Sequence, residues 1–308
     1  MQGYIKKSGR EAGLTLFLFG LLILTVTHIT LVSEGIQRAM RLCADALIPT
    51  LFPFLILTDL LLSRENTEKL LTLISRPLSR LLRLSQKGGV VFLLGVCFGF
   101  PMGAKAIAHY YSRGELSKEE AERLLLFSGN ASPFFLIGSV GVGMLSSPIS
   151  GVTLYLIQLL VSLSCGMVLG FFAPRVASET RSSSYPTHRF SLPHAVQGAV
   201  RQSLFISGYV LFFSALLGII LPYLSHPFLM RLCASLFEIS TACKLATEAE
   251  ELILPFCAFA TCFSGICVYF QTLDCIEGTG LNTKRYLPRK LICGAVGFHL
   301  ALLLSLFH

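Results

Sequence analysis

The chain carries little charge for its length. Of its 308 residues, 14% are charged and 53% are hydrophobic, and the mean hydropathy is +0.70. A soluble domain carries about 25% charged residues, so this composition indicates an integral membrane protein. In a membrane protein the net charge of +8 indicates which loops face the cytoplasm, because basic residues concentrate in cytoplasmic loops. We therefore expect no nucleic acid among the partners.

Patterns that carry enzyme or metal chemistry are also missing. None of the ten cysteines stands in a CxxC pair, and most lie in apolar runs, as is typical of small buried side chains in a reduced protein. The seven histidines have no ligand spacing. The sequence holds no Ser/His/Asp arrangement, no paired intramembrane aspartates and no HExxH motif. We therefore expect no enzyme activity, no metal and no cofactor.

Long apolar runs divide the chain into membrane segments. The first, 12–33, follows three basic residues, lacks a cleavage site and is long enough to span, so we predict a retained helix with a cytoplasmic N-terminus. Further spans are predicted at 46–62, 124–145, 149–172, 202–224, 252–273 and 291–307.

Three polar segments separate these runs. Segment 63–87 alternates leucines with basic residues, which favours a helix lying on the cytoplasmic membrane surface. Segment 175–201 is basic, contains three consecutive serines and is the best candidate linker. Segment 226–251 is acidic, and we expect it to be partly helical.

The stretch 95–133 reads poorly as an ordinary membrane helix. Its first part holds Gly99, Pro101 and Gly103, followed directly by Lys105. Proline removes a backbone donor and glycine relaxes the chain. Inside a bilayer such a break survives only where it is buried or lines a cavity. We therefore expect this break to form half of a solute site.

The two halves of the chain look alike at a shift of about 160 residues. Gln37, Ala39 and Arg41 match residues 197, 199 and 201, and the pair 97–98 matches the pair 262–263, with a glycine-bearing break after each. Paired interrupted segments in two halves predict a transporter-type site near the midplane of the membrane.

The direction of the repeats depends on how segment 88–111 is placed. If every apolar segment crosses, the repeats are parallel and the basic linker lies outside, against the positive-inside rule. A re-entrant hairpin at 88–111 puts the linker inside, leaves segment 226–251 outside and inverts the repeats. The matching hairpin at 252–273 then leaves four basic residues outside, at 284, 285, 289 and 290. We favour the inverted form, and the parallel form stays open.

The sequence thus predicts an all-α, polytopic helical membrane protein with about seven to nine membrane segments. It contains two repeats with broken helices or re-entrant hairpins. Residues 1–34 form an N-terminal transmembrane helix, 35–174 the first repeat with a connecting helix, 175–194 a cytoplasmic linker, and 195–308 the second repeat.

Several stretches resemble one family. Gly-Phe-Pro-Met-Gly-Ala-Lys at 99–105, Leu-Ser-Lys-Glu-Glu-Ala-Glu-Arg-Leu-Leu at 116–125 and Ser-Gly-Asn-Ala-Ser-Pro at 128–133 resemble the YlbJ-type sporulation integral membrane proteins, within the group that carries the nucleoside-recognition or gate domain. The resemblance covers about 35–305. It implies a role in endospore formation, in the mother-cell-derived outer forespore membrane, and dipicolinic acid as cargo moving toward the forespore.

Dipicolinate is a planar dianion, so a carrier must replace its hydration with donors and positive charge. Exposed N–H groups at half-helix N-termini do this in broken helices. Lys105 abuts the first break, and Asn130 and Ser132 lie beside Pro133 at its end. Each has a plainer alternative, because the lysine can reach the membrane surface and the other two can simply cap a helix.

The second half supplies the remaining candidates. Glu238, Ser240 and Thr241 resemble a family motif beside the second site, and a carboxylate there repels an anion unless it is protonated or paired. Glu238 is accordingly a candidate for proton coupling, or an exposed loop acid. Ser264, Gly265 and Gln271 mark the second break. With the first-half residues Gly99, Pro101, Gly103, Lys105, Asn130, Ser132 and Pro133 they make up the predicted substrate site.

Three functions remain open on the sequence. The first is a dipicolinate transporter, and the second is a nucleoside or other small-solute carrier. The third is a structural or assembly protein of the sporulation membrane. The lipid bilayer is a partner in every case, and neither a monomer nor a homo-oligomer is excluded.

Overall fold

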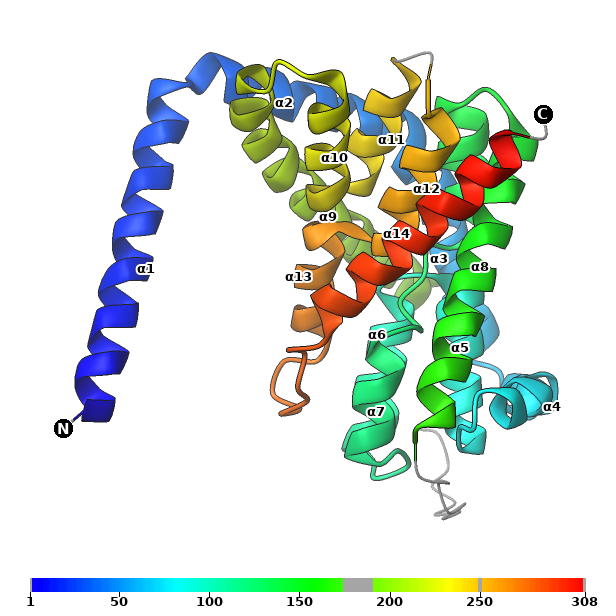
Figure 1. Ribbon diagram of the computed structural model, residues 1–308. Coiled ribbons are helices and arrows are strands. Elements are labelled where there is room, and N and C mark those ends of the chain that lie inside the picture. The colour runs from blue at the N-terminus through cyan, green and yellow to red at the C-terminus, as the bar shows by residue number, and fades with distance from the viewer. Residues whose placement is uncertain (1, 174–190, 249–250, 307–308) are drawn as a thin grey trace.

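The structure, a computed structural model, describes residues 2–173, 191–248 and 251–306. All regular elements in this part of the chain are helices (Figure 1). Four segments are long and apolar enough to cross a membrane, and two bent helix pairs raise the number to six. The four are α8 (Pro148–Phe171), α9 (Leu192–Ile220) with η3 (Leu221–Tyr223), α12 (Ile253–Phe263) with α13 (Gly265–Cys275), and α14 (Tyr286–Ser305). The predicted all-α, polytopic membrane fold is confirmed.

The first predicted span is bent. The chain turns by 88° at His28 between α1 (Gln2–Thr27) and α2 (Ile29–Leu42), and α1 stands apart from the bundle (Figure 1). His28 Nε2 lies 2.6 Å from the Tyr223 hydroxyl in η3, which fixes the bend. The predicted helix over 12–33 is therefore present but is broken at His28.

The chain then descends into the bundle. The π-helical turn η1 (Cys43–Leu47) continues α2 into α3 (Ile48–Leu62), and both α2 and α3 pack on α9. Gly35 and Gly218 allow the close approach, because a Cβ on Gly35 would lie 2.7 Å from the carbonyl oxygen of Ser214. The amphipathic helix α4 (Glu65–Leu81) follows and turns by 102° into the next element.

The re-entrant hairpin predicted at 88–111 is present. It consists of α5 (Gln86–Phe98) and α6 (Met102–Ser112), which pack against each other. Gly99 ends α5 with φ +74°, a value that favours glycine, and Pro101 begins α6. The two arms meet at glycines, since a Cβ on Gly103 would lie 3.2 Å from the Cα of Gly95.

The second hairpin is not where the sequence pattern placed it. Helices α10 (Pro227–Phe237) and α11 (Ile239–Thr247) pack against each other with Glu238 at the tip, whereas residues Ile253–Cys275 form one span of 23 residues. The predicted hairpin at 252–273 is therefore wrong, and the acidic segment 226–251 forms the second hairpin instead. The hairpin α5–α6 and the span α12–α13 both contain a break next to a glycine. The matching breaks in the sequence therefore could not distinguish a hairpin from a span.

Each half therefore contains a hairpin followed by two helices with a break between them, and we call each such pair of helices a broken span. In the first half, α7 (Lys118–Leu125) runs into a turn and an irregular segment at 126–132 and then into the π-helix η2 (Phe134–Met144). In the second half, α12 and α13 are separated by Ser264. Both breaks pack against the tip of the preceding hairpin: Gly99 lies against Ser132, and Gly265 against Phe237.

The two halves have opposite orientations. The hairpin α5–α6 lies in the lower part of Figure 1 and the hairpin α10–α11 in the upper part, while α8 runs downward and α14 upward. The repeats are thus inverted, as favoured from the sequence. The linker predicted at 175–194 falls almost entirely outside the described residues, and α9 begins at Leu192.

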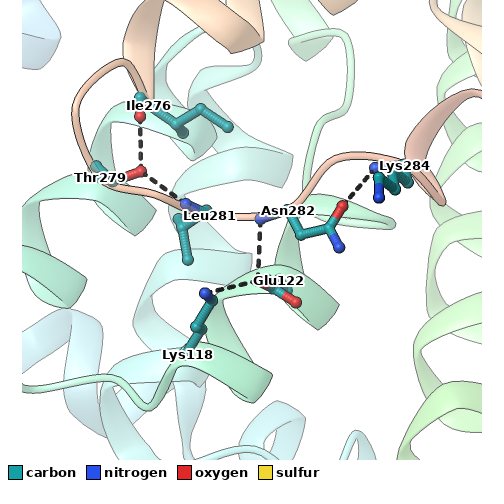
Figure 2. A network of polar contacts seen from close by, with 7 residues as sticks. All are labelled: Lys118, Glu122, Ile276, Thr279, Leu281, Asn282 and Lys284. Atoms are coloured by element: carbon teal, nitrogen blue, oxygen red, sulfur yellow. Dashed lines mark hydrogen bonds and ion pairs between the residues drawn. The ribbon is translucent and has the colours of Figure 1, made fainter. Parts of the chain in front are cut away.

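Because α12–α13 crosses the bundle, the basic loop before α14 lies at the same end as α7. Figure 2 shows the contact between them: the backbone N–H of Asn282 donates to Glu122 of α7 at 2.9 Å, and Glu122 also faces Lys118 at 3.9 Å. The Asn282 side chain in turn accepts from the N–H of Lys284. The conflict with the positive-inside rule that the hairpin at 252–273 created does not arise.

Candidate functional site

The two halves meet at a cavity of about 60 Å³. Both hairpin tips and both broken spans contribute to its wall, and α3 and α9 close it. Four aromatic side chains line it, namely Phe54, Phe98, Phe100 and Phe135. Its polar groups are Ser132, Glu238, Ser240 and Gln271. All four polar residues belong to the set predicted from the sequence.

The cavity is small in this conformation. A cavity of about 150 Å³ holds one benzene molecule, so a volume of about 60 Å³ accommodates only a few waters. An aromatic solute therefore enters only if the wall moves. The cavity lies between the two halves, and in carriers built from inverted repeats such an interface opens when one repeat moves against the other.

The backbone of the first break is paired by side chains of α8. Gln158 donates from Nε2 to the carbonyl of Ala131 and accepts from its N–H, both at 2.9 Å. One turn further, the Ser162 hydroxyl donates to the carbonyl of Phe127 at 2.6 Å. These groups are buried, so the amide and hydroxyl replace the helical hydrogen bonds that the break removes.

The Asn130 side chain bonds to residues at the first break and does not line the cavity. Its Nδ2 donates to the carbonyl of Phe127 at 3.2 Å and to the Ser162 hydroxyl at 3.1 Å, and it is not among the cavity-lining residues. The alternative of a capping role fits this geometry. Ser132 does both, because its Oγ accepts from the N–H of Phe135 at 3.2 Å and it also lines the cavity. Pro133 follows as the start of η2.

Lys105 is placed differently from the sequence prediction. It lies on α6 one turn beyond the break, is exposed, and donates to the side-chain oxygen of Gln202 on α9. It does not line the cavity. The ammonium group is held by Gln202, so the lysine faces α9 and not the cavity.

Glu238 is buried at the tip of the second hairpin. Its two carboxylate oxygens accept from the N–H groups of Ser240 at 2.8 Å and Thr241 at 2.6 Å, so the carboxylate caps α11. The positive end of the helix dipole stabilises this charge. Glu238 is therefore no exposed loop acid. The Thr241 hydroxyl faces Ser214 of α9 at 3.0 Å instead of the cavity.

The second break has a left-handed backbone at two consecutive residues. Ser264 has φ +76° and Gly265 has φ +71°, and a Cβ on Gly265 would lie 2.9 Å from the carbonyl oxygen of Phe237. Only glycine fits there. Gln271, two turns into α13, lines the cavity and donates to Cys267 at 3.4 Å.

A buried lysine joins the two breaks. Lys290 of α14 donates to the carbonyl oxygen of Gly129 in the first break and to the Ser264 hydroxyl, at 3.3 Å, in the second. Its side chain is 3% exposed, and no carboxylate pairs with it among the described residues. An ammonium group held in this way is a candidate functional residue.

Three residues of this arrangement, Lys290, Gln158 and Ser162, are not in the predicted substrate site. Lys290 was grouped with the basic loop, although Tyr286, Lys290 and Cys293 recur at the spacing of one helix face. Gln158 and Ser162 also stand four residues apart within an uncharged run. Such polar pairs in an apolar helix are the signal that could have found them.

A comparison with curated proteins agrees with the resemblance. The sporulation integral membrane protein YlbJ of Bacillus subtilis (strain 168) is 24% identical to this chain over an alignment of 320 positions, which covers 90% of this chain and 78% of the relative. The chain is thus similar to this sporulation membrane protein over most of its length. No family model matches the chain, so the gate domain stays a prediction. No solved structure matches it either.

Proposed function

We propose that the chain is a transporter for a small anionic solute and that it acts in endospore formation. In this proposal it moves dipicolinic acid across the mother-cell-derived outer forespore membrane toward the forespore, with its N-terminus in the cytoplasm. The relative is named as a sporulation integral membrane protein. This name supports a location in a membrane and a role in sporulation. The cargo follows from the resemblance to the family.

One observation supports the proposal that the protein is a transporter. Two inverted hairpins and two broken spans converge on a single cavity between the halves, and the cavity has aromatic walls and four polar groups. Irregular backbone within a bilayer needs hydrogen-bond partners from other segments, and neither a scaffold nor a packing role requires it. A site at the interface of inverted repeats is the arrangement used by carriers that alternate between the two sides.

Glu238 gives this carrier a way to accept an anion. Its carboxylate occupies the N–H groups of Ser240 and Thr241, which are the donors that a cargo carboxylate needs. Protonation of Glu238 removes its charge and frees these donors, so the cargo carboxylate takes its place and a proton enters with the cargo. Lys290, which contacts both breaks, supplies positive charge for the second carboxylate when the cavity widens.

The deciding experiment is uptake of radiolabelled dipicolinate by vesicles that contain the purified protein. We expect saturable uptake that Lys290→Met abolishes while Lys105→Gln, outside the cavity, keeps most of it. Absence of uptake in the unsubstituted protein, with correct insertion shown by protease protection, would overturn the transport of dipicolinate and favour an assembly role.

A second candidate is a carrier for a neutral solute such as a nucleoside. The cavity-lining residues include a carboxylate and an amide but no lysine or arginine, and this set suits a neutral heteroaromatic ring. Competition separates the two candidates in the same vesicles. Under the anion proposal an excess of unlabelled dipicolinate blocks uptake and uridine does not, and the reverse result would establish the neutral carrier.

A further inference from the structure

We propose that α4 is a binding site for anionic phospholipid headgroups and holds the first hairpin at the membrane surface. This inference concerns a surface remote from the cavity and does not depend on the transported solute. Helix α4 has three distinct faces, lies at the end of a membrane span and is tied rigidly to α5.

The first face of α4 packs on the protein. Ser75, Ser79 and Leu82 are buried, and Leu71 and Leu78 pack against the core around α5. A Cβ on Gly89 would clash with the Ser79 side chain, which shows how closely the two helices approach. This contact fixes the rotation of α4 about its own axis, so its other two faces have defined directions.

The second face is an exposed apolar stripe. It consists of Leu70, Leu73, Ile74 and Leu81, which recur at the spacing of one helix face and are between 48% and 59% exposed. The third face is basic and consists of Lys69, Arg76 and Arg80, all exposed. No acidic residue occurs between 69 and 83, although Glu65 and Glu68 stand in the first turn. Adjacent apolar and basic stripes are the pattern of a helix lying in a membrane interface.

The position of α4 in the fold agrees with a helix that lies in the membrane interface. Its axis makes an angle of 102° with that of α5, and Figure 1 shows it at the lower end of the bundle, across the direction of α8. The residue after its C-terminal turn, Arg83, donates to the carbonyl oxygen of Phe171 at 3.2 Å. Phe171 is the last residue of the 24-residue span α8. The C-terminal end of α4 is thus level with the boundary between membrane and water.

The elbow between α4 and α5 is fixed from α7 as well. Ser85 donates its N–H to the buried carboxylate of Glu120 at 2.6 Å, and Arg123 donates to the carbonyl of Arg83 at 2.7 Å. The elbow residue Arg83 has φ +50°. Because these bonds lock the angle, lipid bound along α4 fixes the orientation of α5, whose far end carries the hairpin tip at the cavity.

Charge complementarity identifies the occupant. Each Lys or Arg near an anionic bilayer surface contributes about 1 kcal/mol, and three such side chains lie beside a stripe that enters the acyl region. An acidic protein could also meet the basic face, but it would leave the adjacent apolar stripe without a lipid contact. The partner is therefore an anionic phospholipid such as phosphatidylglycerol.

Lipid contact is tested by introduced tryptophan, because the chain has none. In full-length protein in vesicles, Leu73→Trp should be strongly quenched by lipids brominated on the acyl chain near the headgroup. The control Lys284→Trp, in the polar loop before α14, should not be quenched. An unquenched tryptophan at 73 would overturn the proposal, since the stripe would then face water or protein.

Headgroup preference is tested by charge removal. Phosphatidylglycerol should raise the thermal midpoint of the purified protein more than phosphatidylcholine does, and this difference should fall with salt. The triple change Lys69→Gln, Arg76→Gln, Arg80→Gln should weaken the apparent affinity for phosphatidylglycerol by roughly 100-fold. The matched change Arg38→Gln, Arg41→Gln, Lys244→Gln removes three exposed charges at the other end and should leave the affinity unchanged. Equal loss in both variants, or no loss in the first, would overturn the anionic preference.

Discussion

At the scale of single residues, side chains from neighbouring helices replace the backbone pairing that each break gives up. Gln158 is the clearest case, because one amide satisfies both the N–H and the carbonyl of Ala131. Lys290 does the same for the carbonyl of Gly129 and adds a charge. A buried polar group left without a partner is destabilising, so these side chains hold the irregular backbone in place.

The change Gln158→Leu tests this role. It leaves two buried backbone groups unpaired, and at about 1–3 kcal/mol each the expected destabilisation is roughly 2–6 kcal/mol. The measurement is the thermal midpoint of the purified protein in detergent. Gln37→Leu, the same replacement at an exposed site, is the control and should shift the midpoint little. Equal midpoints for the two variants would show that water satisfies the break.

Glu238→Gln tests the proton coupling proposed for the second hairpin. The amide keeps one acceptor for the α11 N–H groups but cannot gain or lose a proton. Uptake by the unsubstituted protein should increase as pH falls, because protonation of Glu238 admits the cargo. Uptake by the variant should not change with pH. A variant that keeps the full pH dependence would assign the proton to another group.

At the scale of elements, the hairpin α5–α6 depends on backbone contact at its glycines. Gly95→Ala should be destabilising by about 1–3 kcal/mol, because the added Cβ would clash with the carbonyl oxygen of Ser128 in the break. The control Gly198→Ala in α9 meets nothing within 4 Å and should be neutral or slightly stabilising. The measurement is the thermal midpoint of each purified variant, compared with that of the unsubstituted protein. A Gly95→Ala midpoint at or above that of the control would show that the hairpin can move away from the break.

The elements also show how far the sequence could predict the fold. The helical spans, the break at Gly99 and the first hairpin follow from apolar length and from glycine and proline. The second hairpin does not follow from the sequence, because the acidic residues in 226–251 are typical of a polar loop. Glu238 is buried only because other helices pack around it. Lys105 and Lys290 show the same limit at the site. Both lysines lie within helices, and the packing of these helices leaves the first exposed and the second buried.

At the scale of the whole molecule, the basic segments gather at one end. The N-terminus, α4, α7 and the loop before α14 all lie at the lower end in Figure 1, and from the positive-inside rule we expect this end to be cytoplasmic. The turn between η3 and α10 lies at the opposite end.

Two conservative changes test this orientation. Ser112→Cys lies at the lower end and Ser225→Cys at the upper end, and both positions are exposed. In intact cells an impermeant maleimide should label Ser225→Cys and should label Ser112→Cys only after permeabilisation. The unsubstituted chain, with its own cysteines, gives the background. The opposite labelling pattern would reverse the orientation of the whole bundle.

The pairing of Ala131 with Gln158, and of Gly129 with Lys290, also sets an order of assembly during synthesis. When the break at 126–132 leaves the ribosome, neither α8 nor α14 has yet been made, so its backbone has no partner in the bilayer. The break can settle only after α8 has been inserted, and it is complete only when α14 arrives. A chain stopped after α8 should therefore insert but remain sensitive to proteolysis at the break, so that the first half does not mature independently of the second.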